Sequence, residues 1–378
     1  MKTVQRIVIA ALALVCGLPP VIAQSKNDVI AYIGTYTRGK SKGIYAWRFS
    51  PSSGKLTELG LAAETSNPSF LAIHPNHKVL YAANENATGT VTAFSLDPAT
   101  GKLTLLNSAA SHGNGPCHLV VDHGGNFLFV ANYGSGNIAV LPLHADGSLG
   151  ESTTVIQHAG SSANKARQSG PHAHCVTQSP DGHFVMVEDL GLDQVMVYRF
   201  DAADGALTAN DPPFAKLPPG TGPRHLAFSP NGRFAYVVGE MFSNITAFHY
   251  DRTRGALDSF QTISMLPDNF KGNNSGAEVV IHPNGKFLYG SNRGDNSVAV
   301  FAVDSGKGTL TALERVPTQG KTPRSIAIDP TGQYLFAAHQ DSDSIVVFKI
   351  NSKTGIPAAT GEVLEAGAPV CVLFVAAH

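Results

Sequence analysis

The sequence has little charge and no excess of either sign. Only 15% of its 378 residues are charged, and 27 basic residues face 28 acidic ones for a formal net charge of -1. A chain without a basic or acidic field gives no reason to expect nucleic acid or another polyanion as a partner. Hydrophobic residues make up 43%, with 38 Gly and 23 Pro, so the chain can bury a large core while turning often. This composition disfavours both disorder and a multi-pass membrane protein.

Well-known enzyme and metal motifs are also missing. The sequence has no G-x-S-x-G nucleophile elbow, no P-loop and no H-E-x-x-H segment, so covalent serine catalysis has no support. Of the four cysteines, Cys16 lies in an N-terminal segment that we predict below to be removed. The other three, Cys117, Cys175 and Cys371, lie too far apart for a C-x-x-C site, and their odd number gives no disulfide framework. We expect these cysteines to be small buried hydrophobic residues, and we expect no cofactor and no metal.

The first 23 residues have the pattern of a secretory signal peptide. Lys2 and Arg6 flank an apolar run from Ile7 to Leu18, and Ala23 ends a short segment that resembles a cleavage site. We therefore predict that residues 1–23 are removed and that the protein is exported, to the periplasm or outside the cell. Residues 24–378 are then expected to form a single domain with no membrane contact.

Two interleaved repeats run through the rest of the chain. Seven short segments share an Asp, Ser or Asn turn followed by Gly, and these glycines are 46 to 58 residues apart. They are Gly54, Gly101, Gly147, Gly205, Gly255, Gly308 and Gly355. Six further segments, such as GPRHLAFSPNGRFAYVVGE, join two alternating apolar runs through a turn of the Pro-Asn-Gly type, which is a hairpin signal.

Each repeat unit therefore holds four strands, and units of roughly 40 to 50 residues with four strands are typical of propeller blades. We predict an all-β fold, a seven-bladed β-propeller with four antiparallel strands per blade. The C-terminal segment APVCVLFV supplies a first strand, whereas the N-terminal segments VIAYIGTYT and GIYAWRF lack one. The two ends of the chain are thus expected to share one blade, which leaves no exposed strand edge in the ring.

Alignment of the repeats predicts which residues surround the central channel. The reference positions are the turn prolines and their one equivalent: Pro75, His123, Pro180, Pro230, Pro283 and Pro330. The sixth residue before each reference and the tenth after it should lie at the same mouth of the channel. These residues are Ser69, Cys117, His174, Arg224, Ala277 and Arg324, and Glu85, Tyr133, Leu190, Glu240, Arg293 and Gln340.

Charged side chains gather at these inner positions, although close packing at the axis calls for small or apolar ones. Arg224, Arg293 and Arg324 offer planar guanidinium groups suited to a carboxylate or phosphate. His174 and Glu240 are able to move a proton near neutral pH. The alternative is a set of structural ion pairs between blades, and Arg324 in particular fits either interpretation.

Five further residues lie beside these positions: His118, His172, Asp189, His225 and Glu278. Strand alternation predicts that His118, His225 and Glu278 point away from the mouth and brace the blades through hydrogen bonds. His172 and His174 with Asp189 could also ligate a metal ion. Their spacing fixes no geometry, so a metal site is not our prediction.

Several strings resemble one known family, the seven-bladed β-propeller lactonases. They include YIGTYT, NPSFLAIHPN, PHAHCV, GPRHLAFSPNGRFAYVVGE and HPNGKFLYGSNRGDNSVAVF, and the resemblance covers essentially the whole chain after residue 23. The family contains propeller-type 6-phosphogluconolactonases and carboxy-muconate lactonizing enzymes. The resemblance implies ester chemistry at a lactone, without a required metal, at the channel mouth. For the muconate branch it implies a His, two Arg and a Glu, here His172 or His174, Arg224, Arg293 and Glu240.

The resemblance therefore implies hydrolysis of a sugar lactone, of the kind that converts 6-phosphogluconolactone to 6-phosphogluconate. The expected catalytic residues are His174, Glu240, Arg224 and Arg293, and the expected substrate-binding residues are His172, Arg324, Glu85, Tyr133 and Asp189. The expected partner is the small-molecule lactone alone, and we expect a monomer or weak dimer.

Two alternatives stay open: a muconate-type lactonizing cycloisomerase, and a non-catalytic exported propeller that serves as a docking platform. Export also conflicts with a phosphorylated sugar lactone, which belongs in the cytoplasm, so the natural substrate is left open.

Overall fold

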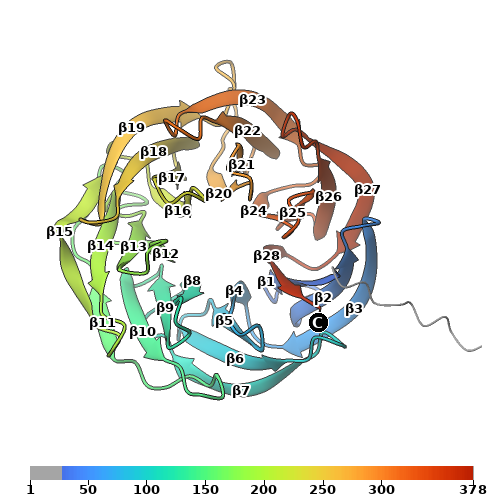
Figure 1. Cartoon of the computed structure of the whole chain (residues 1–378), viewed down its shortest axis with the longest axis horizontal. Helices are drawn as coiled ribbons and strands as arrows, with labels where there is room; N and C mark the ends of the chain where they lie inside the picture. The colour runs from blue at the N-terminus through green and yellow to red at the C-terminus, as the bar shows by residue number, and fades with distance from the viewer. Residues whose placement is uncertain (1–27, 378) are drawn as a thin grey trace, which may run out of the picture.

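The computed structural model describes residues 28–377, which form seven four-stranded antiparallel sheets arranged in a ring around a central channel (Figure 1). No helix occurs within this range. The predicted seven-bladed β-propeller is therefore confirmed. The predicted signal peptide, residues 1–23, lies outside the described residues, and within them no helix is long and apolar enough to cross a membrane.

Each blade runs from an inner strand at the channel to an outer strand at the rim (Figure 1). The inner strands are β4 (Pro68–Ile73), β8 (Pro116–Val121), β12 (Ala173–Gln178), β16 (Pro223–Phe228), β20 (Gly276–Ile281), β24 (Pro323–Ile328) and β28 (Pro369–Ala376). The second strands are β1 (Val29–Thr35), β5 (Val79–Asn84), β9 (Phe127–Asn132), β13 (Phe184–Asp189), β17 (Phe234–Gly239), β21 (Phe287–Asn292) and β25 (Tyr334–His339). The third strands are β2 (Gly43–Ser50), β6 (Thr90–Leu96), β10 (Asn137–Pro142), β14 (Gln194–Phe200), β18 (Asn244–Asp251), β22 (Ser297–Val303) and β26 (Ser344–Ile350). The outer strands are β3 (Lys55–Glu64), β7 (Leu103–Ala110), β11 (Thr154–Gln157), β15 (Leu207–Lys216), β19 (Ala256–Ser264), β23 (Leu310–Pro317) and β27 (Pro357–Glu365).

One blade is assembled from both ends of the chain, as the sequence predicts. Its strand order is β28, β1, β2, β3, and β28 pairs antiparallel with β1 from Val29 opposite Ala376 onward. The red C-terminal strand therefore lies against the blue N-terminal strands in the ring (Figure 1). The pairing satisfies the backbone groups of β1 that an open ring would leave at an exposed edge.

The hydrophobic core lies between blades rather than at one centre, because each sheet packs its faces on its two neighbours. One such cluster joins Met186 and Val197 of one blade to Val237 and Phe248 of the next, all nearly or fully buried. Seven clusters of this kind occur within residues 28–377. Blade stability thus depends on the neighbouring blades, as in other stacked repeat proteins.

The repeated turn glycines join neighbouring blades as well as reversing the chain. All seven adopt positive φ, between 65° and 84°, which only glycine does without cost. A β-carbon on Gly255 would overlap the Phe184 ring of the preceding blade. Tyrosines in the second strands donate hydrogen bonds to the carbonyls of these turns, as Tyr81 does to Gly147 at 2.8 Å and Tyr289 to Gly355 at 2.8 Å.

Candidate active site at the channel mouth

A polar cavity of about 340 Å³ opens at one mouth of the channel. Its lining includes seven of the twelve residues that the alignment of the repeats predicts at the mouth of the channel. The lining residues are Tyr36, Glu85, Cys117, Tyr133, Arg167, His174, Glu240, Ser275, Arg293 and Arg324. Ser69, Ala277, Leu190 and Gln340 do not line it, and Arg224 lies beneath it, bonded to residues of its wall.

One backbone hydrogen bond, repeated in every blade, positions the residues that follow the second strands around the cavity. The residue directly after each second strand donates its N–H to the carbonyl of the residue just before the inner strand. Glu240 does so to Gly222 at 2.7 Å, and Arg293 to Ser275 at 2.9 Å. In the shared blade the corresponding residue is Tyr36, which donates its N–H to the Ala368 carbonyl at 3.0 Å.

A register shift of the β-bulge type positions the second residues of the inner strands. In every blade the pairing between inner and second strand shifts at the second residue of the inner strand, where Cys117, His174, Arg224 and Arg324 lie. A bulge leaves its extra residue unpaired and re-aims its side chain. Cys117, His174 and Arg324 therefore reach the cavity at the point where their strands begin.

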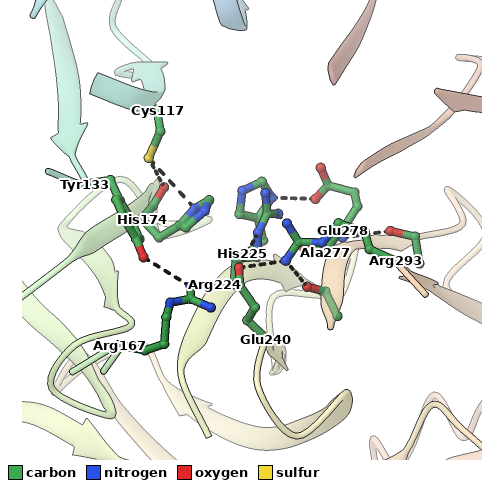
Figure 2. Close-up of polar contacts among 12 residues, drawn as sticks. Cys117, Tyr133, Arg167, His174, Arg224, His225, Glu240, Ala277, Glu278 and Arg293 are labelled. Atoms are coloured by element: carbon green, nitrogen blue, oxygen red, sulfur yellow. Dashed lines mark hydrogen bonds and ion pairs between the residues drawn. The ribbon is translucent and has the colours of Figure 1, made fainter. Parts of the chain in front are cut away.

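Glu240 is the centre of an ion-pair network in the wall (Figure 2). Its side chain is only 6% exposed, and its carboxylate contacts Arg167 at 2.7 Å, Arg293 at 2.8 Å and Arg224 at 3.1 Å. Burial alone would raise the pKa of Glu240, but Arg293, Arg224 and Arg167 together lower it to about 2. Glu240 is therefore a fixed anion that holds three guanidinium groups in place.

Two of these arginines are also tied to the backbone. Arg224 donates to the Ala277 carbonyl at 2.7 Å, and Arg293 donates to the Gly276 carbonyl at 2.8 Å. Burial, partly offset by Glu240, lowers the pKa of Arg293 to about 10, which still leaves it charged at neutral pH. Both cations are thus held rigidly at the cavity, as stabilisation of a developing oxyanion requires.

Arg324 is held differently. Within residues 28–377 its guanidinium makes no hydrogen bond or ion pair, and it lies over the Tyr36 ring, 5.5 Å from the centroid. Tyr36 in turn donates to Glu85 at 2.9 Å. Although burial alone would lower the pKa of Arg324, the nearby Tyr36, Glu85 and Glu240 raise it. Arg324 is therefore a permanent cation that faces the cavity with its donors unused.

His174 also faces this cavity. Its ring lies edge-on to Tyr133, with centroids 5.4 Å apart, and also packs against His225. Burial and then the positive charges of Arg224, Arg324 and Arg293 hold the pKa of His174 well below its usual value. His174 is therefore a neutral imidazole at neutral pH and can accept a proton.

His172 and Asp189 do not line the cavity. His172 stacks on the outer side of Tyr133, with ring centroids 4.6 Å apart. The Asp189 carboxylate contacts His158 Nδ1 at 2.6 Å and accepts the N–H of His172 at 2.8 Å and of Gly191 at 3.0 Å. Asp189 thus positions the loop before β12, and nothing in this arrangement brings His172, His174 and Asp189 together around a metal ion.

Three cavity residues escaped the sequence analysis. Tyr36 was missed because its blade lacks a turn proline to align, and Ser275 because it precedes the inner strand. Arg167 comes from the loop between β11 and β12, and the largest spacing of turn glycines, 58 residues between Gly147 and Gly205, marks that loop in the sequence. The Arg167 side chain is 43% exposed and reaches across the mouth to both Glu240 and the Tyr133 hydroxyl.

The third residues of the inner strands form a second tier directly below. Strand alternation predicted that His118, His225 and Glu278 lie on the other side of the strand from the mouth residues, and none of them lines the mouth cavity. They do not point outward, however, because the bulge turns consecutive side chains toward the channel. The His118 and His225 rings lie 5.2 Å apart, and His225 also contacts His174 of the upper tier. The predicted bracing does occur, since His225 Nδ1 bonds to Glu278 of the next blade at 2.6 Å (Figure 2).

A larger hollow of about 650 Å³ lies away from the channel, along β14 and the turns beside it. Its lining includes Phe184, Arg199 and Arg252, and the Arg199 guanidinium covers the Phe184 ring. It does not bring together a proton acceptor and several fixed cations as the mouth does. We therefore place the candidate site at the channel mouth.

Comparison with known proteins gives a consistent result. The family model described as "Lactonase, 7-bladed beta-propeller" matches residues 30–374. The chain is 38% identical over 296 residues to a 6-phosphogluconolactonase of Bacillus subtilis, covering 78% of this chain and 83% of that one. It is 30% identical to a 6-phosphogluconolactonase of Formosa agariphila, covering 78% and 85%. The solved periplasmic gluconolactonase of Pseudomonas aeruginosa superposes with a TM-score of 0.88 at 36% identity, covering 93% of this chain and 100% of that one.

Proposed function

The chain belongs to the seven-bladed β-propeller lactonase family, and from this premise we propose that it hydrolyses the ring ester of a sugar lactone at the channel mouth. One observation carries the proposal: a neutral imidazole and several fixed guanidinium groups face one cavity. Ester hydrolysis needs a proton acceptor for water and positive charge where the carbonyl oxygen becomes negative. His174 supplies the first requirement, and Arg293 supplies the second.

The proposed reaction uses His174 as the general base. His174 takes a proton from a water molecule as the water oxygen attacks the lactone carbonyl carbon. The arginines stabilise the tetrahedral oxyanion, the bond from that carbon to the ring oxygen breaks, and the His174 imidazolium returns the proton to the ring oxygen. The product is the open-chain hydroxy acid, and the proposed reaction uses no metal or cofactor.

Glu240 was the other candidate for the base. Arg167, Arg293 and Arg224 lie within 2.7 to 3.1 Å of its carboxylate oxygens, so these oxygens are already engaged by cations and are not available to take a proton from water. We propose instead that Glu240 positions Arg167, Arg224 and Arg293. Tyr133 and Glu85 then contribute hydrogen-bonding groups for the hydroxyls of the sugar.

The docking-platform alternative is less well supported. The large apolar side chains that are exposed include Leu105, Val155, Leu313 and Val363, which lie on the outer strands of four different blades. A docking face is expected to gather such residues into one patch. A lactonizing cycloisomerase would use the same cations and proton acceptor, and the experiment below includes its substrate class.

We also propose that the protein acts after export. The signal-peptide pattern of residues 1–23 and the likeness to a periplasmic gluconolactonase both support this location. An exported enzyme would meet unphosphorylated sugar lactones more readily than 6-phosphogluconolactone. Both lactones therefore belong in the first test.

The test is acid release by the purified protein from gluconolactone and from 6-phosphogluconolactone, with spontaneous hydrolysis subtracted. We expect turnover of at least one of them, and a more than tenfold loss of kcat/KM in Arg224→Ala with thermal unfolding that remains cooperative. A matched control is Arg199→Ala, which removes an arginine outside the channel. Turnover equal to buffer with both lactones, or unaltered turnover in Arg224→Ala, would contradict the assignment. Turnover of an unsaturated diacid alone would favour the cycloisomerase.

A further inference from the structure

A second group of reactive side chains lies below the candidate active site, in the lower tier of the channel. His118 of β8, Cys175 of β12 and His225 of β16 have potential ligand atoms that all lie within 4.8 Å of one another. Each is the third residue of its inner strand, and the three strands belong to successive blades. We refer to His118, Cys175 and His225 as the lower-tier cluster. The lactonase chemistry proposed above uses none of them.

Buried polar groups at this cluster lack partners. His225 Nε2 is buried and has no hydrogen-bond partner among the described residues. Glu188, paired with Cys175 across the sheet, is fully buried, and neither of its carboxyl oxygens has a hydrogen-bond partner of normal geometry there. Unsatisfied groups of this kind are costly, and several around one point call for an unseen ion or water.

The surroundings suit a metal cation in particular. Glu278 lies 2.6 Å from His225 Nδ1, so an ionised Glu278 accepts the Nδ1 proton and leaves the Nε2 lone pair directed elsewhere. A carboxylate behind a metal-binding imidazole is the usual supporting arrangement of such sites.

Charge balance is also adequate. The charges of Arg224, Arg324 and Arg293 all act on His225 and would oppose a cation, but Arg224 and Arg293 are paired with Glu240, at 3.1 and 2.8 Å. Around the cluster itself, the Cys175 thiol, Glu188 and Glu278 can each carry a negative charge.

We propose that the lower-tier cluster binds one divalent transition metal ion of the zinc type, with His118, Cys175 and His225 as its protein ligands and the buried Glu188 carboxyl group beside Cys175. Two imidazoles and a thiolate are a ligand set that zinc favours over calcium or magnesium. Binding replaces the Cys175 S–H bond with a metal–sulfur bond and releases that proton to solvent. The ion would join three successive blades at the axis. It takes no part in the proposed lactone hydrolysis, so the inference stands or falls independently of that function.

A second hollow, of about 480 Å³, lies between the later residues of the inner strands, away from the substrate cavity. Phe70, Glu278 and Cys371 are among its lining residues. The hollow thus reaches the carboxylate that bonds to His225, although none of the three cluster residues lines it.

The test is the zinc content of protein purified from zinc-supplemented medium and passed through a column to remove loosely bound metal. We expect about one zinc per chain in the wild type, and less than about a tenth of that in Cys175→Ser. Cys371→Ser is the matched control, because Cys371 is also a buried cysteine on an inner strand but lies outside the cluster. It should retain the zinc.

Three further measurements make the result decisive. Glu278→Gln should weaken zinc binding about tenfold, as loss of a supporting carboxylate does at other sites. Cobalt(II) in place of zinc should give a thiolate charge-transfer band in the wild type that is missing from Cys175→Ser. If Cys175→Ser proves unfolded, His118→Gln replaces it. Equal metal content in wild type and a folded cluster variant, including none in either, would overturn the proposal.

Discussion

The division of labour between Glu240 and His174 is decided by what surrounds each side chain. Glu240 meets three guanidinium groups and stays ionised, whereas His174 meets cations and apolar surface and stays neutral. Both residues looked equally able to move a proton in the sequence. Their environments push the two pKa values in the same direction, downward, which suits a fixed anion in one case and a neutral base in the other.

The pH dependence of the reaction tests the role of His174. Because its pKa is held well below 6.5, the imidazole is already unprotonated at about pH 6, and kcat/KM should be nearly constant between about pH 6 and about pH 8. Below that range activity should fall as the base gains a proton. The measurement is kcat/KM against pH after subtraction of spontaneous hydrolysis, with His174→Asn as the inactive reference. An inflection near pH 6.5 would mean that the base is a group with an ordinary imidazole pKa.

Arg324 is expected to select for an anionic group on the substrate. Its guanidinium faces the cavity without a protein partner among residues 28–377, so a phosphate can take its donors at no cost to the fold. Replacing Arg324 with Met should raise KM for 6-phosphogluconolactone about tenfold or more and change KM for gluconolactone by less than about threefold. Arg324→Lys should restore part of the effect. An equal change for both lactones would show that Arg324 does not contact the phosphate.

At the scale of strands and turns, two repeated devices build the site. The bulge at the second residue of each inner strand directs side chains into the channel. The hydrogen bond after each second strand positions the residue that follows that strand at the mouth. Neither device depends on the identity of the side chain it presents. The blades can therefore carry His, Arg, Cys or Ala at equivalent positions while the backbone stays the same.

The turn glycines are expected to be essential for packing one blade on the next. In Gly255→Ala a side chain would adopt φ of 65° and would also overlap the Phe184 ring. The expected loss of unfolding free energy is about 2 to 4 kcal/mol, the sum of left-handed backbone strain and overpacking.

Gly39→Ala is the matched control, because Gly39 has nearly the same φ, 64°, but nothing within 4 Å of its β-carbon position. It should cost only about 1 to 2 kcal/mol. Urea unfolding measures both. Equal losses in the two variants would show that the contact with Phe184 adds nothing to the strain.

For the whole molecule, closure of the ring is the main requirement. Strand β28 gives the shared blade its inner strand and pairs with β1 over its full length. The residues of this blade also pack on both neighbouring blades, through Leu71 on one side and Phe336 on the other.

Removal of residues 369–378 should therefore destabilise all seven blades together. The edge of β1 would be exposed and the apolar side chains that β28 covers would face water, so we expect self-association and loss of cooperative unfolding. Size-exclusion chromatography and thermal unfolding of the shortened chain measure this against the full chain. A monomeric shortened protein that unfolds like the full chain would show that the other six blades are stable without closure.

Much of this protein can be predicted from the sequence. Turn glycines that recur every 46 to 58 residues and alternating apolar runs predict seven blades and a shared closing blade, because backbone geometry and hydrophobic alternation are local properties. The same register predicts that His174, Arg293, Arg324 and Glu240 meet at one mouth of the channel. The family is likewise evident from the strand motifs.

Other features were decided only by the tertiary structure. Regular alternation in the sequence placed His118, His225 and Glu278 on the other side of the strand from the mouth residues, but a bulge at each inner strand turns them toward the channel. Arg167 enters the site from a loop whose path depends on the hydrogen bond from the His172 N–H to Asp189. The repeat pattern gives no sign of this bond between two separate segments. The choice of His174 over Glu240 as the base depends on charges contributed by other blades. Such long-range placement sets burial and electric field, so the chemistry of each side chain follows from the folded ring rather than from its place in the chain.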